Sequence, residues 1–289
     1  MFIKLTGMAL ALALALVIVP GAPAKAADRQ AGVDQAYDQI RRAIADAGLE
    51  RVIAIDHARL GTEAGSPMPP ARVQIFSDPA LNSRILADNI RAGLDLPFRV
   101  LTFDTGGAVA SSFTDARFLK IRHGLSDDVA LATFDAILAE TLDAAGVTAR
   151  PAPTRGLARD YGILELTSAR GFDDTVAGLR DIVSAQSDTI WFGDVDFTFE
   201  AGRVGIDLPR ATLLLFGGPA PGGIAMADFP SIGLDAFCQK LLVYEDAEGR
   251  VQVIYNDIAA LAQLHYGDAI DVHHGLNKRL TETFNRAIE

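Results

Sequence analysis

Two histidines in the first half of the chain lie where an acid–base pair could form. His57 directly follows Asp56 at the end of an expected strand, and His123 comes later in the same half. An imidazole oriented by a carboxylate is the usual general base of a hydrolase, because its ordinary pKa lies near 6.5. No serine lies in a G-x-S-x-G nucleophile elbow, however. In the alternative interpretation Asp56 and Asp115 cap local elements and His123 closes a helix end.

A second group of potential ligands lies near the C-terminus. Imidazole and carboxylate groups bind zinc or copper, so a cluster of them offers a metal site. The spacing matches no zinc-protease or zinc-finger motif. The five candidate ligands are His265, Asp268, Asp271, His273 and His274.

A glycine-rich segment follows an apolar run in the second half. Residues 216–223 read F-G-G-P-A-P-G-G, which resembles a phosphate-binding loop. The segment lacks the Lys-Ser/Thr pair of a P-loop and the helix that follows a Rossmann fingerprint. We therefore interpret it as a turn.

The elements that position these residues occur twice. Residues 69–101 align with 209–241 without a gap, and beyond the next turn, which differs in length, His123 aligns with His265. Self-similarity on this scale predicts two equivalent units. The aligned turns could line a small concave surface at one end of each sheet. This ligand-binding hypothesis names Asp56, His57, Pro79, Asp95, Asp196, Pro219 and Asp235.

Hydrophobic periodicity predicts an α+β fold with mostly antiparallel sheets and helices on one face. For the first unit, residues 27–147, we expect a helix at 33–47, strands at 51–56, 71–76, 99–104 and 108–113, and helices from Asp115 and Ser126. For the second, residues 157–289, we expect strands at 162–166, 190–199, 211–216, 241–245 and 251–255, and helices at 172–183 and from Asp257. The proline-containing segment 148–156 is the expected linker, and the first unit lacks room for an opening strand.

The N-terminus predicts export. Residues 1–26 carry Lys4, an apolar run from Met8 to Val19, and the small-x-small motif Ala24-Lys25-Ala26. Such a pattern is typical of a cleaved signal peptide, and the apolar run is too short to span a bilayer. We expect a protein of the bacterial periplasm with no membrane segment after cleavage. The single cysteine, Cys238, has apolar neighbours and is expected to be buried and inert.

Composition excludes several classes of function. Hydrophobic residues make up 49% of the chain, which rules out a disordered acidic tail. A net charge of −11 disfavours nucleic acid and anionic membrane surfaces as partners. No sequence motif indicates a cofactor. The expected partner is a small molecule or another protein.

Several strings resemble a known family. Ile55-Asp56-His57-Ala58, Leu94-Asp95-Leu96-Pro97 and Arg122-His123-Gly124-Leu125 are similar to the DUF302 family, and the second unit resembles it through Tyr255-Asn256-Asp257. The resemblance implies a β-α-β4-α unit like that of TATA-box-binding proteins, sometimes in tandem, and implies no accepted activity. Phe197 stands at the position of His57 in the second unit.

These observations favour an exported, non-enzymatic binding or accessory module for a small ligand or partner protein. A hydrolase that uses Asp56-His57 or His123 is the first alternative. Metal binding at the C-terminal cluster is the second.

Overall fold

The computed structural model describes residues 22–289. Most of the predicted signal peptide, residues 1–21, lies outside the described residues. The first described element is α1 (Ala22–Asp46), which includes the predicted cleavage motif. Within the described range, no helix combines the length and the apolar character that a bilayer crossing requires.

The first unit contains four strands and five α-helices before the connecting segment. After α1 they are β1 (Glu50–Asp56), α2 (His57–Glu63), β2 (Ala71–Ser77), α3 (Pro79–Asp88), the 3-10 helix η1 (Ile90–Leu94), β3 (Phe98–Asp104), β4 (Val109–Phe113), α4 (Ala116–His123) and α5 (Asp128–Ala145). The strands pair antiparallel in the order β1-β2-β3-β4.

The second unit repeats this order with an opening strand in front. Its elements are β6 (Ile163–Thr167), α6 (Phe172–Ser184), β7 (Ile190–Asp196), α7 (Phe197–Arg203), β8 (Ala211–Gly217), α8 (Pro219–Met226), the 3-10 helix η2 (Pro230–Leu234), β9 (Gln239–Glu245), β10 (Val251–Asn256), α9 (Ile258–Tyr266) and α10 (Asp271–Ile288). The sheet order is β6-β10-β9-β8-β7. The predicted α+β class with two tandem units is confirmed.

The segment expected to be a linker completes the first sheet. Its residues Ala149–Pro151 form β5, which pairs parallel with β4 at the sheet edge that β6 occupies in the second unit. A proline is tolerated there because an edge strand leaves one side of its backbone unpaired. The missing opening strand of the first unit is thus replaced from the opposite end of the unit.

Aspartate side chains begin several helices. Asp56, Asp115, Asp196 and Asp257 each accept a backbone N–H of the helix that follows, which satisfies donors that the helix itself leaves free. The capping roles expected for Asp56, Asp115 and Asp257 are confirmed. The strand predicted at 190–199 is too long, because Asp196 caps α7 and ends β7 there.

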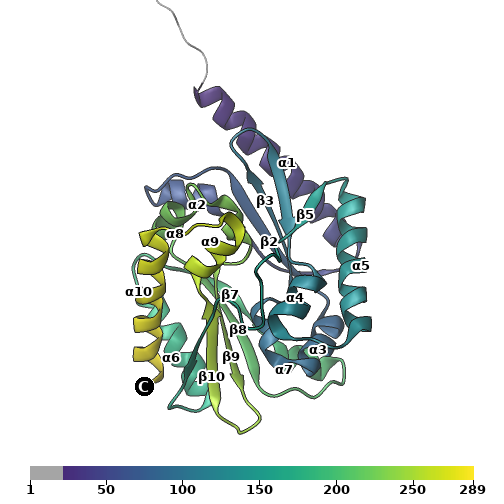
Figure 1. Cartoon of the computed structure of the whole chain (residues 1–289), viewed down its shortest axis with the longest axis vertical. Coiled ribbons are helices and arrows are strands. Elements are labelled where there is room, and N and C mark those ends of the chain that lie inside the picture. Colours follow the sequence, from purple (N-terminus) through teal and green to yellow (C-terminus); the bar gives the residue numbers. More distant parts are fainter. Residues whose placement is uncertain (1–21) are drawn as a thin grey trace, which may run out of the picture.

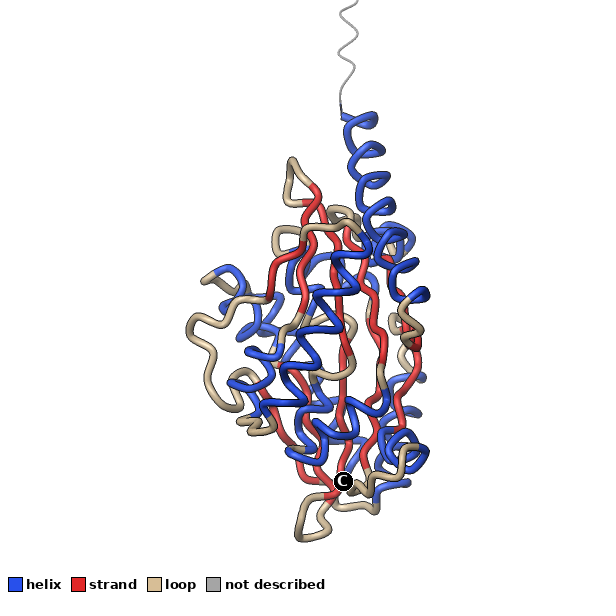
Figure 2. The backbone as a smooth tube through the Cα atoms, turned by 90° about the vertical axis from the view of Figure 1, so that its right-hand side faces the viewer, coloured by secondary structure: helices blue, strands red, loops and turns tan. Residues whose placement is uncertain are grey.

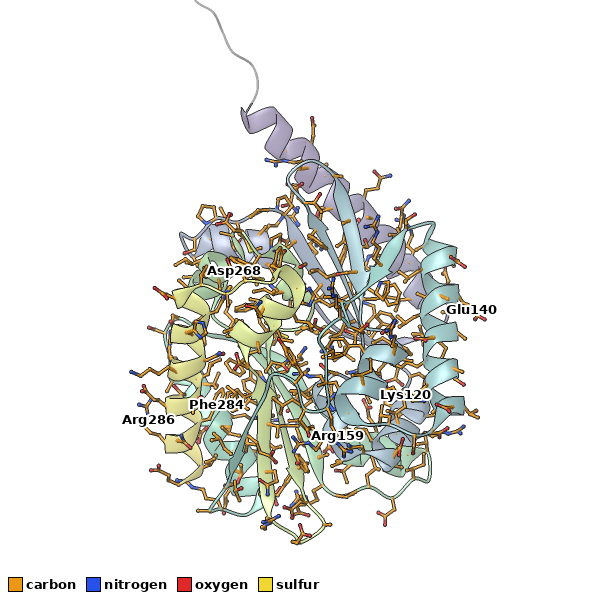
Figure 3. All side chains as sticks on the ribbon, viewed as in Figure 1. Lys120, Glu140, Arg159, Asp268, Phe284 and Arg286 are labelled. Atoms are coloured by element: carbon orange, nitrogen blue, oxygen red, sulfur yellow. The ribbon has the colours of Figure 1, made fainter. Side chains whose placement is uncertain are left out.

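Each sheet has one face covered by its own helices. On the first sheet the Phe98 ring stacks on Phe76 and on Phe134 of α5, and α1 packs on β2 and β3. On the second sheet Phe284 of α10 packs edge-on against Phe216 and Tyr255 (Figure 3). Burial of one such aromatic side chain stabilises the fold by about 1.5–3 kcal/mol.

The other face of each sheet is covered by the other unit. Helix η2 lies on β2, β3 and β4, whereas η1 lies on β8, β9 and β10. Helix α2 packs against α8, and α3 packs against α7. Figure 1 shows the strands between α1 and α5 on one side and α6 and α10 on the other, and Figure 2 shows the same strands in red among the blue helices. The two units therefore share one hydrophobic interior.

Strand pairing corrects the sequence alignment of the two units. Phe76 lies opposite Phe98, but Phe216 lies opposite Gln239, so the second unit has one additional residue before β9. The equivalent of Leu101 is Leu242 rather than Leu241. In the same way Arg99, opposite Ile75, corresponds to Lys240, opposite Leu215. The gap-free alignment of the sequence conceals this pair of basic residues.

Candidate functional site

Asp95 and Asp235 lie at the interface between the two units. Each immediately follows the 3-10 helix that rests on the sheet of the other unit. Both side chains have 0% exposure. The aligned turns therefore bring these residues into the interior, not onto the concave surface that the repeat led us to expect.

Asp95 is the centre of a buried ionic network. Its Oδ1 accepts a hydrogen bond from Arg99 Nη2 at 3.0 Å, and its Oδ2 accepts one from Arg122 Nη1 at 2.7 Å. His123 Nε2 lies 2.7 Å from the same Oδ2. Burial opposes ionisation, but Arg122 and Arg99 outweigh it and hold the pKa of Asp95 well below its usual range.

Asp235 has an equivalent histidine but fewer cations. His265 Nε2 lies 2.8 Å from its Oδ2, as His123 does on Asp95. Its Oδ1 accepts from Arg99 Nη2 at 3.2 Å and from the Thr114 hydroxyl at 3.3 Å. Burial again opposes ionisation, but His265 and Arg99 lower the pKa of Asp235. One guanidinium group thus serves both carboxylates.

Arg122 connects the network to the backbone of the second unit. Its Nε donates to Tyr161 O at 2.9 Å, and its Nη2 donates to Gly162 O at 3.1 Å and to Asn256 Oδ1 at 2.7 Å. The side chain is fully buried. Its counterpart is Leu264, which directly precedes His265 as Arg122 precedes His123, so the second unit has no equivalent clamp.

The equivalent basic residues Arg99 and Lys240 have different partners. Arg99 binds both aspartates, although its Nε and Nη1 have no hydrogen-bond partner among the described residues. Lys240 is 3% exposed and makes no hydrogen bond or ion pair within residues 22–289. Burial, followed by repulsion from Arg99, lowers the pKa of Lys240 to about 7.

A separate cavity of about 20 Å³ lies between α2 and α8. His57 lines this cavity, is 7% exposed, and has no hydrogen-bond partner for Nε2 among the described residues. Burial lowers its pKa to about 4, so the ring is neutral at pH 7. Pro219 and Cys238 also line the cavity, and burial raises the pKa of the thiol to about 11. The expected burial of Cys238 is confirmed.

Contrary to the prediction of a turn, the glycine-rich segment forms α8 from Pro219 onward, and it forms one wall of the His57 cavity. Gly217, Gly218, Gly222 and Gly223 all belong to its lining, with Met226 and Phe237 beside them. A β-carbon on Gly223 would lie 2.3 Å from Ser66 O, so this glycine permits the close approach of α8 to the segment after α2. Gly222 differs, since a β-carbon there would meet only the Phe237 ring at 3.5 Å.

The equivalent position in the other half is filled. Phe197 stands in place of His57 and is fully buried, and Asn82 and Ser83 stand in place of Gly222 and Gly223. Asn82 Nδ2 donates to Ser77 Oγ at 2.8 Å. The His57 cavity therefore forms at only one of the two equivalent contacts between the units, the one between α2 and α8.

The remaining residues of the ligand hypothesis have structural contacts. Asp56 caps α2 and forms ion pairs with Arg59 and Arg72. Asp196 caps α7, and Pro79 is the first residue of α3. The structure brings His57 together with Pro219, and Asp95 together with Asp235. It leaves Asp56, Pro79 and Asp196 outside both groups.

The two acid–base candidates, Asp56-His57 and His123, have different surroundings. Asp56 makes no hydrogen bond with His57 within the described chain, because its carboxylate is held by α2 and two arginines. His123 does pair with Asp95, but its ring is buried and that carboxylate is already held by Arg99 and Arg122. Burial lowers the pKa of His123.

The candidate metal ligands near the C-terminus point to different places. His265 contacts Asp235 and Ser231, whereas His273 Nε2 lies 2.9 Å from Ala225 O. Asp268 is in the loop between α9 and α10 (Figure 3). Asp271 and His274 are exposed on α10. Over residues 22–289, no three or more His, Cys, Asp or Glu side chains are grouped to hold a metal ion.

Sequence reasoning missed Arg99, Lys240 and the clamp formed by Arg122. The available signal was a basic residue within an apolar strand, as in F-R-V-L and Q-K-L-L. A charged side chain at such a position must be paired or must serve a site, because burial of an isolated charge is costly.

Fold and interface together define a class: a two-unit α+β protein whose halves bury a shared polar centre. A family model described as "Domain of unknown function DUF302" matches residues 25–145 and 164–288. The chain belongs to this family. A crystal structure of an uncharacterised conserved DUF302 protein from Bacillus stearothermophilus aligns with a TM-score of 0.37 and 15% identity, covering 44% of this chain and 98% of that one.

Two curated relatives from Brucella match part of the chain. The protein "Fluoride-specific ion channel FluC 1" of Brucella suis is 37% identical over 87 residues, which are 29% of this chain and 34% of that protein. Its namesake from Brucella abortus is equally identical over 87 residues and is covered to 32%. The chain thus spans about a third of the length of these relatives.

Proposed function

We propose that this protein is an exported, non-enzymatic binding protein that takes a small ligand into the cavity beside His57. The observation that carries the proposal is the unpartnered Nε2 of a buried histidine, since His57 is only 7% exposed. A buried polar atom without a partner costs about 1–3 kcal/mol, which a ligand that bonds to it would recover.

The comparison with the filled half supports the same conclusion. Phe197 and Asn82 show that this scaffold can close the equivalent space with ordinary side chains. The contact between α2 and α8 instead has His57 of the first unit and two glycines of the second unit. Core packing alone does not require a cavity at one of two equivalent contacts, whereas a ligand site does.

The lining indicates the kind of ligand. Most of it is apolar, and His57 is neutral at pH 7 because burial lowers its pKa to about 4. We therefore expect an uncharged molecule of a few heavy atoms with one hydrogen-bonding group. The name of the Brucella relatives makes fluoride an additional ligand to test. The lining of the cavity does not indicate where fluoride would bind.

Native mass spectrometry of protein isolated from its own cells tests this function. We expect a bound mass in the wild type and its loss in Gly222→Ala, whose methyl group enters the cavity at ordinary contact distance from Phe237. Gly202→Ala is the matched control, because its methyl group meets no atom within 4 Å. Methanol and ethanol, which are small enough for a cavity of about 20 Å³, serve as probes in a calorimetric titration.

These binding measurements can also contradict the proposal. No bound mass and no saturable heat with either probe in the wild type would contradict the proposal, as would equal binding by Gly222→Ala. The same samples test export, because the periplasmic fraction should contain a chain that begins at Ala27. A chain that retains residues 1–26 and stays in the cytoplasm would contradict that part.

A further inference from the structure

The interface between the units carries an excess of buried positive charge. Three basic side chains, Arg99, Arg122 and Lys240, face two carboxylates, Asp95 and Asp235. Protonation of either neighbouring histidine would only increase the excess. When Lys240 is protonated, as it is below its pKa of about 7, the centre lacks one negative charge.

The excess charge lies on specific atoms. Arg122 uses all of its nitrogens in hydrogen bonds, but Arg99 leaves Nε and Nη1 free of partners among the described residues. The Lys240 ammonium group donates no hydrogen bond to any described side chain or carbonyl. Among its neighbouring charges, Arg99 acts most strongly on Lys240. The unused donors thus belong to the two equivalent positions of β3 and β9.

An acceptor between these positions would satisfy donors and charge together. We propose that one small monovalent anion binds at the interface, held by the Lys240 ammonium and the free N–H groups of Arg99. An anion of charge −1 removes the excess completely, whereas a dianion would reverse it. Burial of both side chains restricts the ion to a few atoms, as in a halide, formate or nitrate.

This site is distinct from the His57 cavity. Neither Arg99 nor Lys240 belongs to the lining of that cavity, and the ligand expected there is uncharged. The two proposals can therefore fail separately. His57→Phe should abolish binding in the cavity and leave anion binding unchanged, and Lys240→Met should do the reverse.

The test is a titration of the full mature chain with sodium fluoride, chloride, nitrate and formate. Sodium gluconate keeps the ionic strength constant, and thermal unfolding and calorimetry report binding. We expect at least one of the anions to stabilise the wild type saturably below about 100 mM with one site per chain, since a ligand stabilises the state that binds it. Bromide with anomalous scattering locates the ion.

The matched variants decide the outcome. Lys240→Met should lose at least tenfold in affinity, whereas Lys278→Met removes the same charge from an exposed side chain and should bind like the wild type. If Lys240→Met does not fold, the anion affinity of Lys240→Gln is compared with that of the wild type instead. Equal affinity in the Lys240 variants, or no saturable anion effect in the wild type, would overturn the proposal.

Affinity should also depend on pH. The groups that face Lys240 are Arg99 from β3, Asp95 after η1, Asp235 after η2 and Cys238 beside it on the chain. Both aspartate pKa values are lowered and that of the thiol is raised to about 11, so these three groups keep their charge state between pH 6 and 9, whereas the pKa of Lys240 is lowered to about 7. Binding should weaken above pH 7, by up to tenfold per pH unit. If the affinity stayed the same from pH 6 to pH 9, that result would contradict this mode of binding.

Discussion

Arg99 and Lys240 occupy equivalent places in the two halves of one interface, yet their surroundings differ. Arg99 binds Asp95 and Asp235 together, while Lys240 binds neither. The reason is chemical, because a planar guanidinium can direct several donors to separate acceptors, whereas an ammonium is a single point of charge. Duplication produced the pair, and divergence concentrated the ion pairing on one member.

His57 and Phe197 show the same division of roles. Phe197 fills its half of the interface completely, and His57 leaves a cavity and an unpartnered nitrogen. In both comparisons one of two equivalent residues fills space or forms ion pairs, whereas the other, His57 or Lys240, forms no side-chain hydrogen bond within residues 22–289. Perturbed polar groups of this kind concentrate at functional sites. The following predictions test that asymmetry.

The largest expected effect is the loss of Asp95. Asp95→Asn removes the charge that holds Arg99, Arg122 and His123, and we expect it to lower the free energy of unfolding by about 3–5 kcal/mol. Asp235→Asn should cost less, because Arg99 keeps its bond to Asp95. Urea denaturation of both variants measures the difference. Equal losses would show that the two aspartates are not used differently.

The next largest expected effect is the loss of folding stability at acid pH that His57 causes. Burial lowers its pKa to about 4 in the folded protein, whereas the unfolded chain takes up the proton near 6.5. The unfolded state therefore binds more protons between these values, and stability falls by about 3 kcal/mol as the pH decreases from 6.5 to 4. His57→Phe, which copies the other half, should remove this part of the pH dependence. An unchanged profile in urea titrations would show that other groups cause it.

Lys240→Met should raise stability in anion-free buffer. Replacing a buried cation that has no ion-pair partner by an apolar side chain of similar length removes the cost of burying its charge, so the gain should be largest below pH 7, where Lys240 is protonated. In the wild type, burial and Arg99 lower the lysine pKa to about 7, while the unfolded chain keeps its proton up to about 10.5. Stability of the wild type should therefore rise above pH 7, and this rise should be absent in Lys240→Met. Denaturation at pH 6.5 and pH 9 distinguishes the two chains.

The smallest effect is expected for Gly222→Ala. The new methyl group enters a cavity at 3.5 Å from Phe237, and alanine favours the helix over glycine, so stability should change by less than about 1 kcal/mol. Asn82→Gly, at the equivalent place, should cost more because it removes the hydrogen bond to Ser77. Thermal unfolding compares the pair. A larger loss in Gly222→Ala would mean that the cavity is not free space.

Part of the candidate site could be predicted from the sequence. Pro219, Asp95 and Asp235 were recognised because they recur in the repeat, and His57 because it follows Asp56 at the end of a strand. Arg99 and Lys240 were not, because the additional residue before β9 places them one position out of alignment. Their proximity also depends on how the two sheets face each other, which no local pattern encodes.

The sequence by itself determined the duplication, the α+β class and most of the strands, since period and repeat are properties of neighbouring residues. Only the tertiary structure decided that β5 would close the first sheet and that each 3-10 helix would cover the sheet of the other unit. Those contacts join residues far apart in the chain. They turn aspartates that looked like turn residues into a buried ionic centre, because burial is a property of the assembled interface.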